Sequence, residues 1–432
     1  MLTRKRLSYI SLLFLFAAAC FQFSCRPEIE QQSLAARARK IHDRVLTVDT
    51  HCDTAFRLLD GSWDISVRHE PGGRTSGQID LPRMAEGGLD AEFFAVFVGQ
   101  GERTEQGYAE AKKSAIQSLA AIRAMCDKYP SLVGLALTPD DAYRLEKAGL
   151  RAAFIGMENG YPVGKTLSNL EEYHKLGVRY VTLCHSGDND ICDSSTDEQD
   201  PEDRGLSEFG REVVAACNRL GVMVDVSHAS DRSFADILKV SKAPVIASHS
   251  SCRAICASPR NLSDEMIRAL AAREGVIQVC FLSDYVRTPK PNPEREKAFS
   301  ELRAKYGARR DIKDEAVLKK AREEYEALNE KYPEEEATVS ELVDHIEHVI
   351  GLVGIDYVGI GTDFDGGGGL DDCPDVSQMF RVTEELVRRG RTEQEIAQIW
   401  GGNIMRVFRR VIAVSRDLNS RESPLIPGSM IE

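Results

Sequence analysis

The sequence predicts an α/β fold, a (β/α)8 barrel of the TIM type, from two observations. Eight short runs rich in Val, Ile and Phe recur along the chain, with helical patterns between them. Runs that are apolar nearly throughout are typical of parallel strands covered on both faces by helices. Polar residues also cluster where these runs end, as expected for a barrel whose strands all end on one face. A doubly wound open sheet, the alternative, gives no reason for that clustering.

The predicted strands carry the residues of chemical interest at their ends. The eight runs span residues 45–53, 91–99, 151–158, 178–186, 222–230, 244–251, 275–282 and 357–365. Six of them end in side chains that bind metals or transfer protons, namely His51 and Asp53, Glu158, His185, His228, His249, and Asp363 with Asp365. Because the carboxyl ends of all barrel strands meet on one face, we expect these residues to lie together.

Two segments depart from the alternation of strands and helices. Residues 287–336 are dense in charge and predict one or two solvent-exposed helices inserted after the seventh strand, as a lid, an oligomer contact or an excursion without a role. Residues 416–432 form a tail with Pro and polar residues and no apolar stretch. The barrel domain is therefore expected over residues 38–415.

Composition and charge exclude several classes of protein. The 432 residues include 55 Lys and Arg against 68 Asp and Glu, a formal net charge of −13, and 42% of the chain is hydrophobic. An acidic chain without a basic tract beyond its first residues is not expected to bind nucleic acid, because phosphates require positive charge. Its composition is not that of a disordered chain. Eleven cysteines without a CxxC pair exclude a zinc finger.

The N-terminus has the pattern of an export signal. Arg4, Lys5 and Arg6 precede an apolar run over 7–19, and small residues then lead into Cys20. A cysteine directly after small residues resembles the bacterial lipoprotein signal, in which that cysteine is lipidated and becomes the first residue. We therefore expect a leader over 1–25 with lipidation at Cys20, and a protein held by a lipid at the membrane, in the periplasm or on the cell-envelope face. An ordinary secretory signal and a retained membrane anchor are the alternatives.

The first run suggests a metal site. His51 and Asp53 are two residues apart, which places both side chains on one side of an extended strand. One imidazole and one carboxylate suit Zn²⁺, with Mn²⁺ or Co²⁺ as alternatives. His228 and His249, from adjacent strands, supply two further imidazoles. Glu158 has two carboxylate oxygens and is able to bridge two metals, so the residues predict a binuclear site.

Six motifs in the chain carry a resemblance to a known family. They are DTHCD (49–53), GMENG (156–160), YVTLCHS (180–186), DVSHAS (225–230), SHSSCRAICASPRN (248–261) and GTDFDG (361–366). From about Val45 to Val411 the chain resembles the membrane (renal) dipeptidases, metal-dependent dipeptidases of the amidohydrolase-like barrel class. The stretch from SHSS to CASPRN is the most specific of these motifs.

The resemblance implies a set of metal ligands. By this resemblance His51, Asp53 and Glu158 hold one zinc ion, while Glu158, His228 and His249 hold the other. The two zinc ions, bridged by Glu158, share a water or hydroxide that attacks the peptide bond of a dipeptide.

The resemblance also implies three substrate and proton-transfer roles. His185 contacts the substrate and the tetrahedral oxyanion, Arg260 binds the terminal carboxylate of the substrate, and Asp363 handles protons at the bridging water. His185 and Asp363, together with Glu158, form the expected catalytic set. A homodimer and tolerance of a D-residue at the C-terminal position are further expectations.

Two differences from the family pattern leave alternatives open. Cys52 stands where members often have Asn, and the alternation of a strand points it away from the metals. The loop after His185 is unusually acidic, which leaves the preferred substrate side chain undetermined. The alternative functions are another barrel amidohydrolase that acts on lactones or esters, and an inactive lipid-anchored barrel used for binding.

Overall fold

The structure is a computed structural model that describes residues 33–70, 77–197, 199, 202–307, 312, 314–333 and 335–422. The predicted leader over 1–25, its lipidation site Cys20 and residues 423–432 of the predicted tail lie outside these described residues. Residues 416–422 continue the last helix, α15 (Asn403–Glu422).

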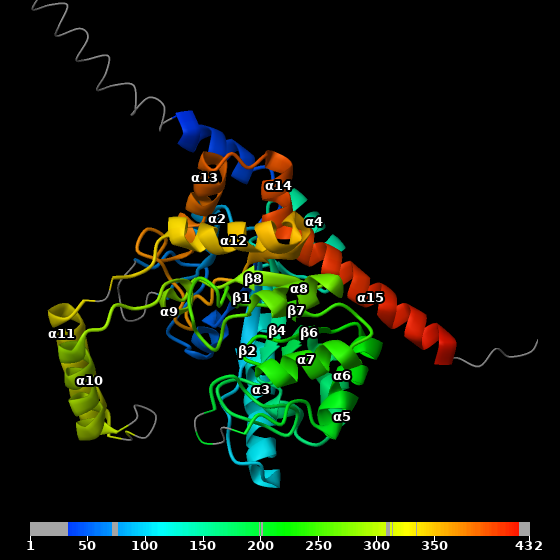
Figure 1. The fold of residues 1–432 in the computed structure, drawn as a ribbon, viewed down its shortest axis with the longest axis horizontal. Coiled ribbons are helices and arrows are strands. Elements are labelled where there is room, and N and C mark those ends of the chain that lie inside the picture. The colour runs from blue at the N-terminus through cyan, green and yellow to red at the C-terminus, as the bar shows by residue number, and fades with distance from the viewer. Residues whose placement is uncertain are drawn as a thin grey trace, which may run out of the picture.

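A nearly closed barrel of eight parallel strands forms the centre of the molecule (Figure 1). Its strands, in spatial order, are β1 (Val48–Cys52), β2 (Ala91–Phe97), β4 (Arg151–Glu158), β5 (Val178–Thr182), β6 (Met223–Asp225), β7 (Ile246–Ala247), β8 (Val276–Val279) and β9 (Val358–Ile360). Each of them lies inside one of the eight predicted runs, in the predicted order. The prediction of a TIM-like barrel is confirmed.

The barrel closes between its first and last strands, beside the candidate metal ligands. The backbone N–H of Asp363 donates to the carbonyl of His51 (3.0 Å), and that of Asp53 donates to the carbonyl of Phe364 (2.8 Å). Below them, the Asp49 carboxylate accepts hydrogen bonds from the Thr362 backbone N–H (2.8 Å) and hydroxyl (2.5 Å). Closure rules out the open-sheet alternative and places the motifs DTHCD and GTDFDG side by side, in parallel.

One strand was not predicted. Strand β3 (Val133–Leu135) pairs with the first residues of β4, before β5 begins to pair with the second half of β4 at Ile155. The short apolar stretch of β3 has Gly134 at the centre, a residue type that strands disfavour, and was not among the predicted runs.

Helices surround the strands. They are η1 (Thr54–Leu59), α2 (Leu81–Gly87), α3 (Glu105–Lys128), α4 (Pro139–Lys147), η2 (Tyr161–Val163), α5 (Leu167–Leu176), α6 (Glu208–Leu220), α7 (Asp231–Val240), α8 (Asp264–Ala272), α9 (Ser283–Val286), α10 (Pro293–Tyr306), α11 (Glu315–Lys331), α12 (Val339–Val353), η4 (Ile355–Tyr357), η5 (Val376–Gln378), α13 (Phe380–Arg388), α14 (Glu393–Ala397), the π-helical turn η6 (Gln398–Gly402) and α15. A helix further upstream covers residues 33–42. Across the described residues, none of these helices combines the length and the apolar character that crossing a membrane requires.

The helices that follow β5, β6 and β7 begin at serine caps. The hydroxyls of Ser207, Ser230 and Ser263 accept from the backbone N–H three residues on, at the starts of α6, α7 and α8. A serine oxygen at this position satisfies one of the amide groups that the first helical turn leaves free. The caps fix where each connection ends and its helix begins.

Helices α10 and α11 form a hairpin that stands away from the barrel (Figure 1). Lys305 and Tyr306 of α10 both contact Glu324 of α11, and the rings of Phe299 and Tyr325 meet edge to face, 5.2 Å apart. No residue of α10 is buried. This hairpin occupies the charged segment singled out in the sequence.

An aromatic layer fills the barrel interior below the strand ends. The rings of Phe93 and Phe154 stack at 4.5 Å, and Tyr180 lies 5.6 Å from Phe93. Phe408 of α15 packs edge to face on Phe154 at 6.1 Å, which closes the far end of the barrel. The barrel is therefore a packed core, and the only polar group that Tyr180 carries, its hydroxyl, points toward the strand ends.

His42 is a buried structural histidine in the outer layer. Its Nδ1 lies 2.7 Å from the hydroxyl of Thr383, and its Nε2 lies 2.8 Å from the carbonyl of Gly87. Trp400 donates to the same Thr383 oxygen (2.7 Å), so the Thr383 hydroxyl is available to donate to His42. This arrangement suits a neutral imidazole, and burial lowers the pKa of His42 to about 4.

The free energy of unfolding should therefore fall as the solution is acidified. The unfolded imidazole takes up a proton with a pKa of about 6.5, whereas the folded one does so only at about 4. Between those values the unfolded state binds more protons, so stability is fully present above about pH 6.5 and decreases below it. From about pH 6.5 to pH 5, wild type should lose ~1 kcal/mol per pH unit more than His42→Gln in denaturant unfolding. Near pH 8 the two slopes should coincide, and equal slopes at acidic pH would refute the assignment.

Candidate metal centre

Glu158, the last residue of β4, lies at the centre of the converging strand ends. Its Oε1 is 3.1 Å from Nε2 of His228, 3.5 Å from Nε2 of His249 and 3.6 Å from Nε2 of His185. Its Oε2 is 3.5 Å from Nε2 of His51. Four imidazoles from four strand ends thus face one buried carboxylate.

Three overlapping groups of ligand atoms lie around this carboxylate. Within each group the nitrogen and oxygen atoms are all within 4.8 Å of one another. The groups are His51 with Asp53 and Glu158, then Glu158 with His185 and His228, and finally His51 with His249 and Asp363. The predicted metal ligands are all present in these groups, and Glu158 belongs to two of them.

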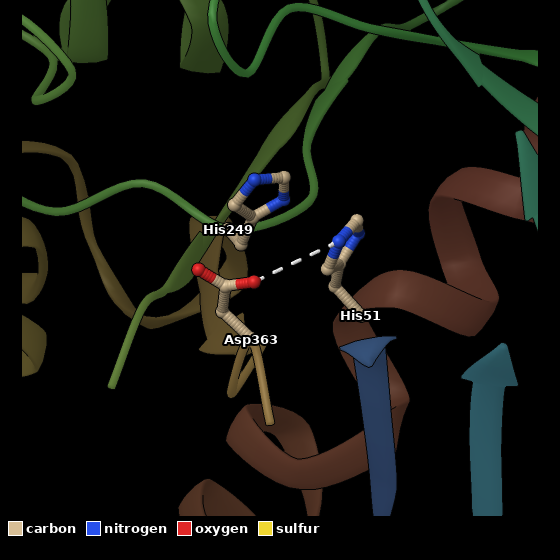
Figure 2. Close-up of side chains that lie close together, drawn as sticks. All are labelled: His51, His249 and Asp363. Atoms are coloured by element: carbon tan, nitrogen blue, oxygen red, sulfur yellow. Dashed lines mark ion pairs between the residues drawn. The ribbon is translucent and has the colours of Figure 1, made fainter. Parts of the chain in front are cut away.

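Figure 2 shows the third group, in which Asp363 and the rings of His51 and His249 converge. One carboxylate oxygen of Asp363 lies 3.9 Å from Nε2 of His51, and the rings of His51 and His249 are 3.9 Å apart. The sequence predicted Asp363 as a proton carrier. Its position among imidazole nitrogens places it directly beside the predicted ligands.

The donor set fits divalent metal ions. Nε2 of His51 and Oδ1 of Asp53 are buried and have no hydrogen-bond partner among the described residues. Nε2 of His51 lies within 3.9 Å of oxygens from Asp53, Glu158 and Asp363. Burying carboxylates so close together is unfavourable unless positive charge compensates. Imidazole nitrogens and carboxylate oxygens are ligands that zinc and similar ions prefer. A pair of divalent ions would satisfy both the charges and the unpaired atoms.

The three buried acids of the cluster differ in how their pKa is shifted. Burial alone would raise the pKa of Glu158, but His51 and His228 hold it well below its usual range. Burial raises the pKa of Asp53 well above its usual range, and the neighbouring charge of Glu158 adds to the effect. Burial raises the pKa of Asp363 to about 7, against the opposing charge of His51. A pKa near neutrality suits a group that accepts and releases a proton, as predicted for Asp363.

The backbone at these strand ends adopts a conformation that is uncommon outside glycine. His228 has φ 70°, Asp363 φ 61° and Asn159, next to Glu158, φ 74°. Residues with side chains visit this left-handed region rarely and at some cost in free energy. Two of the residues that adopt it, His228 and Asp363, belong to the ligand groups.

Arg260 is buried next to the cluster. Its guanidinium donates to the backbone carbonyl of His249 (3.1 Å) and lies over the ring of Tyr285, 5.2 Å from its centre. Its Nε is buried without a hydrogen-bond partner among the described residues. The guanidinium is thus fixed in place and retains a donor, which is the arrangement expected for binding an anionic group.

His185 lies at the edge of the cluster and is more accessible than the other imidazoles. A quarter of its side chain is exposed, and its Nδ1 is 2.9 Å from the hydroxyl of Ser186. The ring of Phe97 packs against it with 4.7 Å between centres. Phe97 is the register partner of Glu158 on β2 and is 44% exposed. The sequence reasoning missed Phe97, although its spacing from Phe93 placed it on the inner face of the strand.

Asp365 is near the site but has a different environment. Its carboxylate accepts from the hydroxyl of Thr54 (2.7 Å), Nε of Arg57 (2.9 Å) and the backbone N–H of Gln78 (3.1 Å). Asp365 belongs to none of the three ligand groups. It joins the loop after β9 to the segment after β1.

The cysteines of the described residues are all free and buried. Cys52 lies in the apolar layer between strands and helices, away from the ligand groups. This agrees with the side of the strand predicted for it.

Comparison with known proteins identifies relatives across most of the chain. The family model for membrane dipeptidase (peptidase family M19) matches residues 35–422. Dipeptidase ataJ of Aspergillus terreus is 30% identical over 412 residues, 89% of this chain and 89% of that protein. Dipeptidase tcpJ of Claviceps purpurea is 30% identical over 386 residues, 88% of this chain and 79% of that protein.

Solved structures share the fold. The probable dipeptidase PvdM from Pseudomonas aeruginosa superposes with a TM-score of 0.75 at 30% identity, covering 89% of this chain and 99% of that one. A metallopeptidase from Rhodobacter sphaeroides, liganded with a phosphinate mimic of the dipeptide L-Ala-D-Ala, superposes with a TM-score of 0.68 at 22% identity, covering 85% and 99%.

Tyr180 supports the site from below, and Gly156 makes room for it. The Tyr180 hydroxyl lies 2.7 Å from Nδ1 of His51. Gly156 is its register partner on β4, and a Cβ at that position would overlap the Tyr180 ring. Neither residue was assigned a role from the sequence, although both lie inside quoted motifs.

Gly156→Ala should therefore displace Tyr180 and loosen His51. We expect a loss of about 1–3 kcal/mol in the free energy of unfolding, as for other overpacked cores, together with weaker binding of divalent metal. Gly61→Ala is the matched control, because a Cβ at Gly61 meets nothing within 4 Å. Denaturant unfolding and metal content measured on both variants test this, and wild-type stability and metal content in Gly156→Ala would contradict it.

Proposed function

The chain belongs to the membrane dipeptidase family, peptidase family M19, and is a hydrolase that acts on peptide bonds; we propose that it cleaves dipeptides at a binuclear zinc centre built around Glu158. The observation that carries the proposal is the position of this one buried carboxylate, whose two oxygens face imidazoles from different strands.

In this proposal the two zinc ions have different ligand sets. His51, Asp53 and Glu158 hold one ion, and Glu158, His228 and His249 hold the other. The short distances from Glu158 to His51 and His228 and the unpaired atoms of His51 and Asp53 support it. When bound, such ions lower the pKa of a shared water and polarise a carbonyl group.

The surrounding side chains carry the remaining steps of the reaction. Asp363, with a pKa raised toward neutrality, accepts the proton of the attacking water and passes it to the leaving amine. His185, at the accessible edge, donates a hydrogen bond to the oxygen on which negative charge develops. Arg260 binds the free carboxylate of the substrate, which restricts the enzyme to very short peptides.

We further propose that the substrate includes dipeptides with a C-terminal D-residue. The mimic bound to the Rhodobacter sphaeroides protein has that stereochemistry. Phe97, exposed beside His185, offers an apolar surface to a substrate side chain.

The proposal extends to location and assembly. Export with a lipid on Cys20 at the membrane rests on the leader sequence, and mass spectrometry of the N-terminal peptide without a lipid would overturn it. Homodimer formation rests on the family resemblance, and a monomer in light scattering would overturn that.

Glu158→Gln should abolish dipeptide hydrolysis together with metal binding. The amide keeps the shape but removes the charge that faces four imidazoles, so zinc content should fall below one ion per chain. Hydrolysis is measured on a panel of L-L and L-D dipeptides, with metal content determined on the same samples.

Glu393→Gln is the control, since this glutamate pairs with Arg44 at the surface. Wild type that binds two metals and cleaves lactones or esters but no dipeptide would favour another amidohydrolase activity. Wild type that binds no metal would favour an inactive binding barrel.

Arg260→Met should weaken recognition of the substrate carboxylate. We expect the KM for a dipeptide to rise by about 10–100-fold, the factor that corresponds to a charged hydrogen bond of about 1.5–3 kcal/mol. A dipeptide amide, which lacks the carboxylate, is the matched control and should show nearly equal KM values for both proteins. An equal effect on the dipeptide and its amide would assign Arg260 another role.

A further inference from the structure

Asp225, the last residue of β6, is a buried acid that the proposed reaction does not use. Its Oδ1 accepts from the backbone N–H groups of Ser227 (3.0 Å) and Ser248 (2.8 Å). Its Oδ2 accepts from the hydroxyls of Thr182 (2.5 Å) and Ser248 (2.6 Å). The carboxylate therefore links β5, β6 and the end of β7, and Ser248 is bound to it twice.

These contacts fix the direction of a hydrogen-bond chain. A carboxylate only accepts hydrogen bonds, so the single hydroxyl hydrogen of Ser248 is directed at Asp225. The Ser248 oxygen then has only lone pairs left for its other neighbour. That neighbour is Nδ1 of His249, at 2.8 Å.

His249 must therefore carry its hydrogen on Nδ1. Because the Ser248 oxygen can only accept on this side, Nδ1 of His249 is the donor, and in a neutral imidazole Nδ1 then carries the single N–H. With that hydrogen on Nδ1, the Nε2 that faces Glu158 at 3.5 Å presents a lone pair. A lone pair on this nitrogen is what a metal ion requires.

We propose that Asp225 and Ser248 are positioning residues that set the tautomer of His249 and so prepare it to bind metal. The proposal rests on the proposed function in that it takes Nε2 of His249 as a metal ligand. Asp225 acts only through Ser248 and contacts neither substrate nor metal.

The other imidazoles lack such a chain. Nδ1 of His51 contacts the hydroxyl of Tyr180, for which the described part of the chain offers no second hydrogen-bond partner to fix its hydrogen. Nδ1 of His228 is buried without a hydrogen-bond partner among the described residues. Of these imidazoles, His249 is the one whose tautomer is set by a carboxylate of the described residues.

An amide in place of the Asp225 carboxylate should reverse the chain. The two backbone N–H groups only donate, so the oxygen of an asparagine must face them and its NH2 must face the hydroxyls. Ser248 would then accept from that NH2 and direct its hydrogen at Nδ1 of His249. The imidazole hydrogen would move to Nε2, where it blocks the metal.

The experiment compares wild type with Asp225→Asn in two readouts. In metal-free protein with ¹⁵N-labelled histidine at mildly alkaline pH, the His249 ring should change from the Nδ1–H to the Nε2–H tautomer. Zinc titrated by calorimetry should bind about 10–100-fold more weakly at one of two sites, the usual effect of losing such a partner.

A second substitution separates this role from a merely structural one. Asp225→Asn combined with Ser248→Ala removes the reversed donor, so zinc should bind more tightly to the double variant than to Asp225→Asn alone. Structural damage would instead make the double variant as weak or weaker. Thr182→Val is the matched control, because Thr182 donates to the same Asp225 oxygen without contacting His249, and it should leave the tautomer unchanged.

An unchanged His249 tautomer in Asp225→Asn, or a double variant no better than the single one, would overturn the proposal. The tautomer is measured without metal or substrate, so it does not depend on dipeptidase activity. Wild type that shows the Nδ1–H tautomer but binds no zinc would refute the proposed function and leave the hydrogen-bond chain supported.

Discussion

The structure depends on placing several carboxylates and imidazoles within a few ångströms of one another, out of water. Glu158 is the fixed point, since its two oxygens lie within reach of His51 on one side and His228 on the other. Such a set of groups is unfavourable in isolation and is acceptable only where cations compensate it. A closed parallel barrel is able to place these groups together, because side chains from the ends of many strands lie on one face.

Holding these groups requires a second layer of polar contacts beneath the first. Tyr180 reaches His51 across Gly156, Asp225 reaches His249 through Ser248, and the Asp49 carboxylate joins β1 to the segment after β9. Tyr180, Asp225 and Asp49 themselves belong to none of the candidate ligand groups. The aromatic layer of the barrel then connects Tyr180 to the apolar core.

The sequence predicts features that depend on residues close together in the chain, and misses features that depend on contacts between distant residues. The apolar runs predicted the eight strands, and the residues at their ends predicted the cluster around Glu158. Both are patterns of neighbouring residues, and the barrel brings the ends of its strands together on one face. Strand β3 was missed because its short apolar stretch is interrupted by Gly134, a residue type that strands disfavour. The contacts of Tyr180 and Asp225 with the histidines or their neighbours were not predicted, because the sequence does not show which residue a buried hydroxyl or carboxylate inside a strand contacts. The environment of Asp365 likewise depends on Arg57 and Gln78, far away in the sequence.

The shortness of β7 has a consequence for how the protein is able to change. This strand has two residues, and its ladder with β6 consists of one pair, Asp225 and Ile246. The Asp225 carboxylate adds to this short ladder by accepting hydrogen bonds from the backbone N–H and the hydroxyl of Ser248. The same atoms that keep this wall together also orient His249. A substitution at Asp225 or Ser248 is therefore expected to change the stability of this wall and the orientation of His249 together, whereas seven register pairs of the backbone join β2 to β4.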